Sequence, residues 1–464
     1  MFGLTGYGIY VALWAAISLL TNLLDLSMTS ALQRVVPTRE TEALAHGAVK
    51  LALLVTVLPA ILVAALVSLN AGAIAPIFSA APADAAQLPT AIALFVWALP
   101  LWTFIEVATS AARARRAFGP EIRLRIFWEQ LARLAFAASF FAFGFESIGL
   151  MAAHLSSLVL TALLCLPLLG KFYDLRALFR APVPRSLARE LIGSGIALLP
   201  ANLSRRMLID APPMLINFML PGARGAAAAG IFEIARKLST VPHIVRQAFQ
   251  YVLGPLSSAQ AHVDRAAIGP LYHFACRVST ALVVPLAGLM IFTGADWLSV
   301  YREEAMAALP LLAMLCAARA AEAIVGPAAT IVEMTGHRGL PLLNSLLAFL
   351  LWIVLALWLT PAHGAMGMAI AVSAAILAAT WAAAVELWVS DGLQPFGRKL
   401  FQALAIVLAG VAAMALVEYL TGGPLRFGLN VTIWAITSWL ALRYGLTRDD
   451  RLALGGVARK LRLV

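Results

Sequence analysis

Apolar residues occur along the chain in repeated blocks of about 20, long enough for helices to cross a hydrocarbon core about 30 Å thick. Stretches such as Leu51 to Leu69 and Leu404 to Leu416 are apolar all round and do not alternate every second residue. Strands of a membrane barrel would alternate, whereas a helix satisfies every backbone polar group within its own segment. The pattern therefore predicts an all-α polytopic membrane protein.

About thirteen blocks approach the length of a membrane helix. Their approximate ranges are 9–31, 51–70, 89–111, 126–143, 148–169, 191–219, 228–255, 275–294, 306–332, 341–360, 366–389, 400–420 and 428–445. The composition, 62% hydrophobic and 12% charged, also excludes an ordinary soluble domain, in which about 45–50% of residues are apolar and about 25% charged. Cys165, Cys276 and Cys316 lack the spacing of a metal or redox site, so we expect small core residues.

Basic residues are distributed unevenly between alternate loops. One set of loops carries about 23 of them, whereas the opposite set holds only Arg224, Arg302 and Arg426. Because positive residues are retained on the cytoplasmic side, the first set and the C-terminus are expected inside and the N-terminus outside. The net charge of +11 therefore belongs to loops between spans, and we expect no nucleic-acid partner.

Two halves of the chain echo each other at an offset of about 220 residues, a duplication common in transporters. The matching segments are 8–10 with 230–232, 116–120 with 335–341, and 149–152 with 367–370. Both copies keep the same orientation, which predicts a parallel repeat. The counterpart of the span at 191–219 would precede residue 1, so we expect a first helix to be missing, through a late start codon or a real loss.

Three segments carry a family resemblance. Gly3-Leu4-Thr5-Gly6-Tyr7-Gly8-Ile9-Tyr10 looks like an "LG..YG.Y" motif, and residues 24–34 look like "DLGL..AL.R", with Ser27 where glycine is usual. Residues 206–235 are similar to "D...L..FLG...G.Y..A". With these segments the chain resembles the O-antigen-type polysaccharide and oligosaccharide flippases of the multidrug/oligosaccharidyl-lipid/polysaccharide exporter superfamily.

The resemblance implies a V-shaped, MATE-like fold of two pseudo-symmetric helical bundles in the bacterial cytoplasmic (inner) membrane. The expected division is an N-terminal bundle at 1–180 that lacks its first helix, a C-terminal bundle at 186–392, and an extra helix pair with a basic cytoplasmic tail at 396–464.

Charged residues inside the predicted spans each need a reason, because a charge at the bilayer centre costs at least about 2.5–3.5 kcal/mol. Four pairs lie one helical turn apart: Glu129 with Arg133, Arg206 with Asp210, Glu233 with Lys237, and Arg319 with Glu322. One interpretation is neutralisation within the helix. The other is that these faces line a water-filled cavity.

On the second interpretation, guanidinium groups bind the diphosphate of a lipid-linked substrate. The candidates for this headgroup site are Arg205, Arg206, Arg246 and Arg319. Arg205, Arg206 and Arg319 lie near the middle of their spans, and Arg205 and Arg246 have no carboxylate one turn away.

Carboxylates without a neighbouring base are candidates for ion coupling, because a buried carboxyl group exchanges a proton readily. Asp25 and Glu106 are favoured, whereas Glu333 is placed at the cytoplasmic interface. His154 and His243 are further candidates for proton exchange, but a lone histidine in a span is more often hydrogen-bonded structurally. Pro200, Pro212 and Pro213 predict a hinge in the helix at 191–219, which either breaks or merely kinks.

No enzyme, cofactor or metal motif occurs in the sequence: Gly170-Lys171 is followed by Phe172, which excludes a Walker A loop and an ATP motor. The favoured function is flipping of an undecaprenyl-diphosphate-linked oligosaccharide for polysaccharide, O-antigen or capsule synthesis, by alternating access coupled to a proton or sodium ion. The partners are then the lipid-linked glycan and membrane lipids, with the protein a monomer. The alternatives are a multidrug exporter of organic cations and an integral-membrane glycosyltransferase or polymerase.

Overall fold

The computed structural model describes residues 3–39, 41–117, 119–145, 147–247, 268–301, 303–334, 339–454 and 456–463. Every regular element in these ranges is a helix. Ten helices in them are long and apolar enough to cross a membrane. The predicted all-α membrane fold is confirmed, whereas the predicted count of thirteen spans is not.

Three of the predicted spans fall outside these ten. The one at 126–143 consists of a π-helix, η3 (Ile122–Trp128), and the short α9 (Glu129–Ala142). The one at 191–219 is divided between the charged α12 (Arg185–Asp210) and α13 (Pro212–Met219). The one at 228–255 begins in α14 (Gly222–Leu238) and continues as helix at 240–247, after which it lies outside the described residues. Each is shorter or more charged than an uninterrupted apolar helix.

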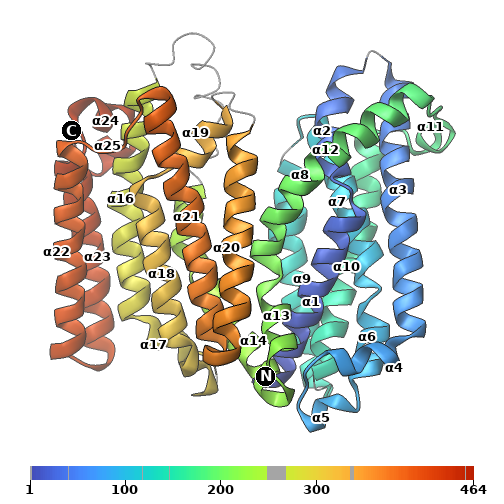
Figure 1. Ribbon diagram of the computed structural model, residues 1–464, viewed down its shortest axis with the longest axis horizontal. Coiled ribbons are helices and arrows are strands. Elements are labelled where there is room, and N and C mark those ends of the chain that lie inside the picture. The colour runs from blue at the N-terminus through green and yellow to red at the C-terminus, as the bar shows by residue number, and fades with distance from the viewer. Residues whose placement is uncertain are drawn as a thin grey trace. The chain divides into compact units, whose positions relative to one another are not determined.

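Contacts divide the chain into two compact units, Met1–Gly230 and Ile231–Val464, and the division falls within α14 (Figure 1). The predicted boundaries near 180, 186 and 396 follow the internal repeat and the family resemblance, and they stay a prediction.

The first unit is built around α1, which contacts α7, α10, α12 and α13. Its buried centre holds aromatic rings: the Tyr10 hydroxyl and His154 Nδ1 are 3.0 Å apart, and the Trp14 and His154 ring centroids are 4.3 Å apart. His154 is fully buried, which agrees with a structural histidine. The other elements are α2 (Met28–Val35), η1 (Val36–Thr38), α3 (Glu42–Leu69), α4 (Ala71–Ile74), η2 (Ala75–Ile77), α5 (Pro82–Ala85), α6 (Leu88–Phe95), α7 (Ala98–Ala114), α8 (Gly119–Glu121), α10 (Ser147–Phe172) and α11 (Leu175–Arg180), with α1 at Leu4–Leu24.

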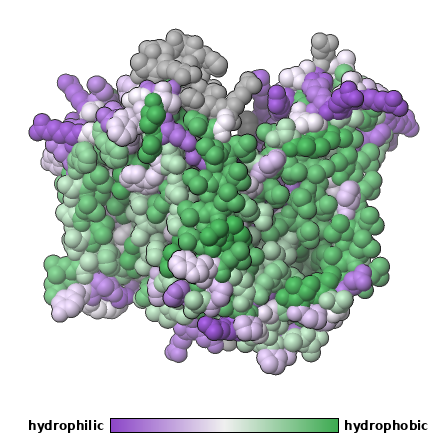
Figure 2. All heavy atoms as spheres, in the orientation of Figure 1, coloured by the Kyte–Doolittle hydropathy of each residue, from purple (hydrophilic) through white to green (hydrophobic). Residues whose placement is uncertain are grey.

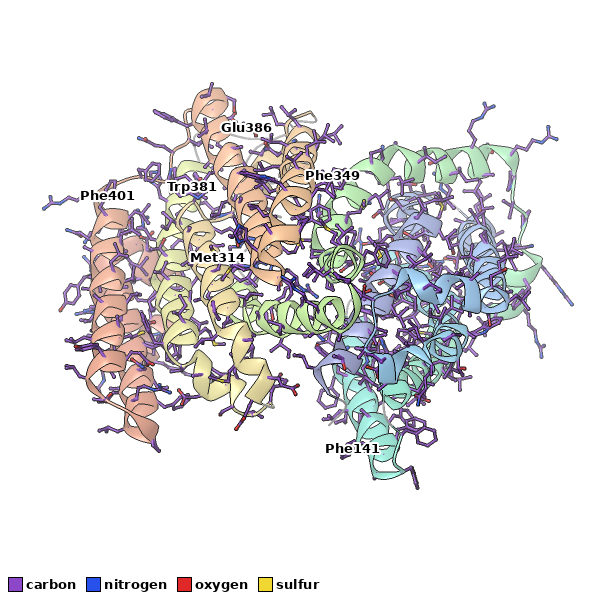
Figure 3. The ribbon with its side chains drawn as sticks, turned by 60° about the horizontal axis from the view of Figure 1, so that its bottom comes forward. Phe141, Met314, Phe349, Trp381, Glu386 and Phe401 are labelled. Carbon is purple, nitrogen blue, oxygen red and sulfur yellow. The ribbon has the colours of Figure 1, made fainter. Side chains whose placement is uncertain are left out.

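The second unit packs α16 against α18, α22 and α23, and α20 against α21. Its elements are α16 (Ile268–Phe292), α17 (Gly294–Leu298), η5 (Glu303–Ala308), α18 (Leu309–Ile324), α19 (Ala328–Met334), α20 (Leu340–His363), α21 (Ala365–Asp391), α22 (Arg398–Leu420), α23 (Gly423–Gly445), α24 (Arg448–Ala453) and α25 (Gly456–Lys460). Phe401 of α22 projects outward and is 58% exposed, as expected of a side chain that faces lipid (Figure 3). Cys165, Cys276 and Cys316 are buried and free, which confirms them as core residues.

Hydrophobic residues cover the middle of the visible face, and polar residues gather at its ends (Figure 2). Contacts join the predicted basic loops within each unit. In the first unit, Arg39 pairs with Glu190 at 2.7 Å, and Lys50 Nζ donates to the Phe179 carbonyl at 2.8 Å. In the second, Arg277 pairs with Asp450 in the C-terminal segment at 2.9 Å. In each unit, the loops joined by these contacts lie at the same end. The assignment of that end to the cytoplasm stays a prediction.

Candidate functional site

The first predicted span is interrupted beside its carboxylate. Between α1 and α2, Leu26 and Ser27 have φ of 47° and 57°, a left-handed backbone that is uncommon outside glycine. The adjacent Asp25 is 8% exposed and accepts hydrogen bonds from the Thr29 hydroxyl at 2.8 Å and the Thr29 backbone N–H at 3.4 Å. The interruption therefore holds a buried carboxylate whose direct hydrogen bonds are uncharged.

Helix α12 packs closely on this interruption. A Cβ atom on Gly195 would lie 2.5 Å from the Leu26 carbonyl oxygen, so only glycine fits without a shift. Asn202 Nδ2 donates to the Ser27 hydroxyl at 3.2 Å. Arg206 lies one helical turn beyond Asn202, and this contact places it on the side of α12 that faces Asp25.

Glu106 has a basic partner that its local sequence does not reveal. Both of its carboxylate oxygens accept from Arg125 of η3, at 2.7 and 3.1 Å, although the two residues are 19 apart in sequence. The same guanidinium lies 4.5 Å from the Trp102 ring centroid and 3.2 Å from Glu121, which also pairs with Arg113 at 3.1 Å. The premise that Glu106 lacks a neighbouring base is therefore wrong.

Asp25, Glu106, Glu121, Arg113, Arg125 and Arg206 together form what we call the first-unit cluster. Asp25 lies within electrostatic range of both Glu106 and Arg206. Arg206 itself is exposed, as is the adjacent Arg205. Asp210 accepts from the Ser18 hydroxyl at 2.7 Å, and Arg206 interacts electrostatically with Asp25 and Glu106, whereas the predicted pairing of Arg206 with Asp210 stays a prediction.

The proline-rich helix is kinked and not unwound. Pro200 lies inside α12, and Pro212 and Pro213 are the first two residues of α13. Between the two helices, Ala211 keeps a helical backbone and its N–H donates to the Met207 carbonyl at 3.0 Å. Proline cannot donate to the preceding turn, so the helix bends at this junction without opening. Of the two alternatives, the structure supports the kink, and whether the kink moves as a hinge stays a prediction.

Arg246 and Arg319 share one carboxylate in the second unit. Glu322 Oε1 lies 2.6 Å from Arg246 Nη2, and its Oε2 lies 3.0 Å from Arg319 Nη1. The Glu322 side chain is 4% exposed, and the arginine side chains are 10% and 19% exposed. We call these three residues with His243 the second-unit cluster, since His243 interacts electrostatically with Glu322 and both arginines.

The second-unit cluster also follows the pattern of a charged site beside a helix interruption. Glu322 lies close to the end of α18, and Gly326 between α18 and α19 has φ of 60°. Arg246 Nε and His243 Nδ1 are buried and have no hydrogen-bond partner among the described residues. The cluster therefore has two guanidinium groups, one carboxylate and unused hydrogen-bonding nitrogens.

The structure thus divides the predicted headgroup residues between the two units and brings Arg246 and Arg319 onto one carboxylate. Three of the four predicted one-turn pairs are confirmed: Glu129 with Arg133 at 2.5 Å, Glu233 with Lys237 at 4.0 Å, and Arg319 with Glu322. Sequence reasoning missed Arg125 as the partner of Glu106 and Arg246 as the second partner of Glu322, because each of these two pairings joins different helices. The Glu333 side chain lies outside the described residues.

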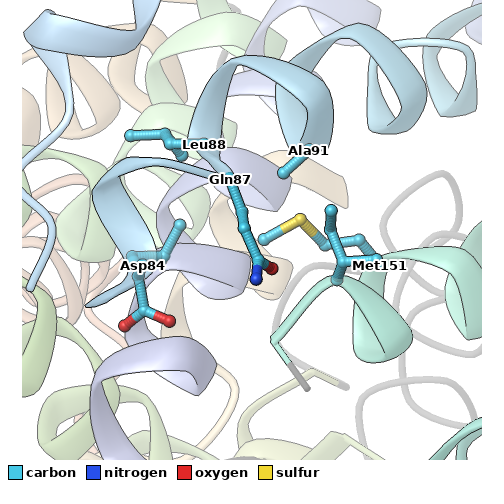
Figure 4. Close-up of a pocket in the computed structure, with 7 residues that line it drawn as sticks. Asp84, Gln87, Leu88, Ala91 and Met151 are labelled. Carbon is cyan, nitrogen blue, oxygen red and sulfur yellow. The ribbon is translucent and has the colours of Figure 1, made fainter. Parts of the chain in front are cut away.

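A small pocket in the first unit is a poor substrate site. Its empty space is about 210 Å³, part of it open to solvent, and Asp84, Gln87, Leu88, Ala91 and Met151 are among its lining residues (Figure 4). Sites for drug-sized ligands usually occupy about 300–1,000 Å³. The charge clusters are therefore the stronger candidates.

No family model and no curated protein matches the sequence. Solved structures do match the fold. A structure of the lipid II flippase MurJ in an inward closed conformation has a TM-score of 0.75 and 10% identity, and the match covers 95% of this chain and 92% of that one. An inward-facing multidrug-resistance MATE transporter of the MOP superfamily has a TM-score of 0.63 and 13% identity, and the match covers 82% of this chain and 93% of that one. A MOP superfamily transporter from Pyrococcus furiosus, described as having a binding pocket of reverse polarity, has a TM-score of 0.56 and 16% identity, covering 82% and 86%. The chain therefore has the fold of the MurJ and MATE transporters.

Proposed function

We propose that this protein is a secondary transporter that flips an undecaprenyl-diphosphate-linked oligosaccharide across the bacterial cytoplasmic membrane. The C-terminus is cytoplasmic, and alternating access is coupled to a proton or sodium ion. The product serves the synthesis of a surface polysaccharide such as O-antigen or capsule. The observation that carries the proposal is a MurJ-like and MATE-like fold in which Arg319, on a helix long and apolar enough to cross a membrane, shares the carboxylate of Glu322 with Arg246.

The arginines suit a diphosphate headgroup. Arg205 lies about 20 residues after the start of α12 and about 14 residues before the end of α13, or about 30 and 21 Å at 1.5 Å per residue, so it lies inside this helical segment and not at either end. Its guanidinium is exposed, so an anion can approach it. Its planar donors match phosphate oxygens, and a lipid diphosphate supplies such oxygens while the glycan crosses.

Asp25 is the stronger of the two ion-coupling candidates. The carboxylate of Glu106 is held at both oxygens by Arg125, and a proton would have to compete with that ion pair. Asp25 accepts hydrogen bonds only from Thr29 among the described residues, and its interaction with Arg206 is longer-ranged. We assign proton or sodium exchange to Asp25 and a structural role to the Glu106–Arg125 pair.

Export of organic cations is the second candidate, because the MATE transporters share the fold. Two observations favour the flippase. The MurJ structure matches 95% of this chain against 82% for the MATE structure. In addition, two arginines and one carboxylate in the second-unit cluster repel a cationic drug.

The test is glycan export in a cell that depends on this protein, with Arg205→Ala and Arg319→Ala. Both variants should abolish export at unchanged protein level, because each removes a headgroup contact. Arg224→Ala is the matched control, since Arg224 is an exposed arginine near the start of α14. Normal export in both test variants, or an equal loss in the control, overturns the proposal.

A further inference from the structure

Glu322 occupies the groups that a substrate anion would need. It binds Arg246 at 2.6 Å and Arg319 at 3.0 Å, one arginine on each carboxylate oxygen. Both oxygens of the carboxylate are therefore engaged, and both arginines already have an anionic partner. A phosphate oxygen cannot take the same guanidinium nitrogens until the carboxylate withdraws.

The arginines nevertheless retain capacity for an anion. Arg246 is 8% exposed, and its Nε is buried without a hydrogen-bond partner among the described residues. A guanidinium carries five N–H donors, so one bond to Glu322 leaves most of them available. The two arginines and Glu322 together carry one net positive charge, which favours an anion of higher charge than a carboxylate.

The carboxylate has an alternative partner when it withdraws. His243 lies within electrostatic range of Glu322, and its Nδ1 is buried and unpartnered in the described part of the chain. A hydrogen bond to this imidazole would compensate in part for the loss of the arginines. His243 is therefore the candidate for a second partner of the carboxylate.

We propose that Glu322 is an internal counter-anion that exchanges with a phosphate group for Arg246 and Arg319 during the transport cycle. The proposal rests on the proposed function, because it assigns the exchange to the arginines of that headgroup site. Glu322 limits the affinity for phosphate, and it restores the ion pairs when the substrate leaves. The arginines are then paired in both states, which avoids the cost of uncompensated buried charges.

Binding of inorganic pyrophosphate to the purified full-length protein, measured by calorimetry, tests the exchange. Glu322→Gln should tighten binding at least about tenfold, because the competing charge is gone, and Glu322→Asp should lie between Gln and the wild type. Glu233→Gln is the matched control: Glu233 is equally buried in the same unit and is held by Arg236 at 2.7 Å, so its loss should not change pyrophosphate binding.

Unchanged or weaker binding in Glu322→Gln overturns the exchange. Should that variant fail to fold, unchanged affinity in Glu322→Asp does the same. If Arg246→Ala loses pyrophosphate binding but neither Glu322 variant binds more tightly than the wild type, the headgroup site is supported and only the exchange is contradicted. If the arginine variants bind pyrophosphate as tightly as the wild type, both the headgroup site and the exchange are contradicted.

A second arm in nanodiscs distinguishes a lipid headgroup from free phosphate. In this arm, the affinities of Glu322→Gln and the wild type are compared for two probes. A larger increase in affinity for a polyprenyl diphosphate than for inorganic pyrophosphate supports exchange with a lipid-linked substrate. An equal gain supports exchange with the phosphate group alone, and no gain for either probe contradicts the proposal.

Discussion

The two charge clusters differ in how many carboxylates accompany their arginines. The first-unit cluster contains three carboxylates, Asp25, Glu106 and Glu121, and three guanidinium groups, Arg113, Arg125 and Arg206. In the second-unit cluster, Arg246 and Arg319 share the single carboxylate of Glu322. The first has equal numbers of acidic and basic groups, whereas the second has one more basic group than acidic.

This difference indicates that the two clusters have different functions. A balanced cluster responds to the gain or loss of a small cation at its least committed carboxylate, Asp25. A cluster with excess positive charge attracts an anion and rejects a cation. Both clusters lie beside a helix interruption with a left-handed backbone, at Leu26 and Ser27 in one unit and at Gly326 in the other.

The largest effect is expected from removal of the charge excess. Arg246→Ala or Arg319→Ala alone leaves one arginine that is neutralised by Glu322, so each variant should reduce the transport rate more than about a hundredfold. The double variant should reduce the rate little further, because the effects of residues that act as a unit are not additive. Transport rates at equal protein level give the measurement. Independent effects that multiply in the double variant would mean that the arginines do not act through one shared carboxylate.

The next effect compares the two carboxylates of the first-unit cluster. Asp25→Asn should reduce ion-driven transport at least about tenfold with folding preserved, because it removes the exchangeable group but keeps a hydrogen-bond acceptor for Thr29. Glu106→Gln should mainly lower stability, since it leaves Arg125 without its bidentate partner. Transport and thermal unfolding are measured on both. The reverse pattern would assign coupling to Glu106.

A smaller effect compares the glycines at the two interruptions. Gly326→Ala places an L-residue at φ of 60° and a Cβ 2.8 Å from Cys276 Sγ, and Gly195→Ala places a Cβ 2.5 Å from the Leu26 carbonyl. Each should lower the free energy of unfolding by about 1–3 kcal/mol. Gly193→Ala is the control in the same helix as Gly195, because nothing lies within 4 Å of its added Cβ. Equal stability of all three variants would show that the interruptions do not require close packing.

The smallest effect concerns Ser27. Its left-handed backbone disfavours serine by about 1–2 kcal/mol, but its hydroxyl accepts from Asn202 at 3.2 Å. Ser27→Gly should therefore be nearly neutral in the wild type and stabilising by about 1 kcal/mol in Asn202→Ala, where the hydrogen bond is already lost. Unfolding midpoints of the wild type, the two single variants and the double variant give a double-mutant cycle. The same effect in both backgrounds would mean that the Asn202 bond contributes nothing.

The sequence was sufficient for the helical membrane fold because apolar blocks of span length have no other stable structure in a bilayer. It also located pairs within one helix, such as Glu129 with Arg133, whose spacing is local. It did not reveal Arg125 as the partner of Glu106, because that contact depends on how η3 packs against α7. The predicted spans at 126–143, 191–219 and 228–255 stay unconfirmed, because η3 and α9 divide the first and charged residues in α12 and α14 interrupt the apolar pattern of the other two.

The most direct test of the account is flipping of a polyprenyl-diphosphate oligosaccharide in vesicles that contain the purified protein. The fraction of substrate accessible from outside the vesicle is followed over time. We predict that the wild type speeds equilibration between leaflets at least about tenfold over empty vesicles. Arg205→Ala and Arg319→Ala should return the rate to that of empty vesicles, whereas Arg224→Ala should match the wild type. A wild-type rate equal to that of empty vesicles, with the protein folded, would contradict the account.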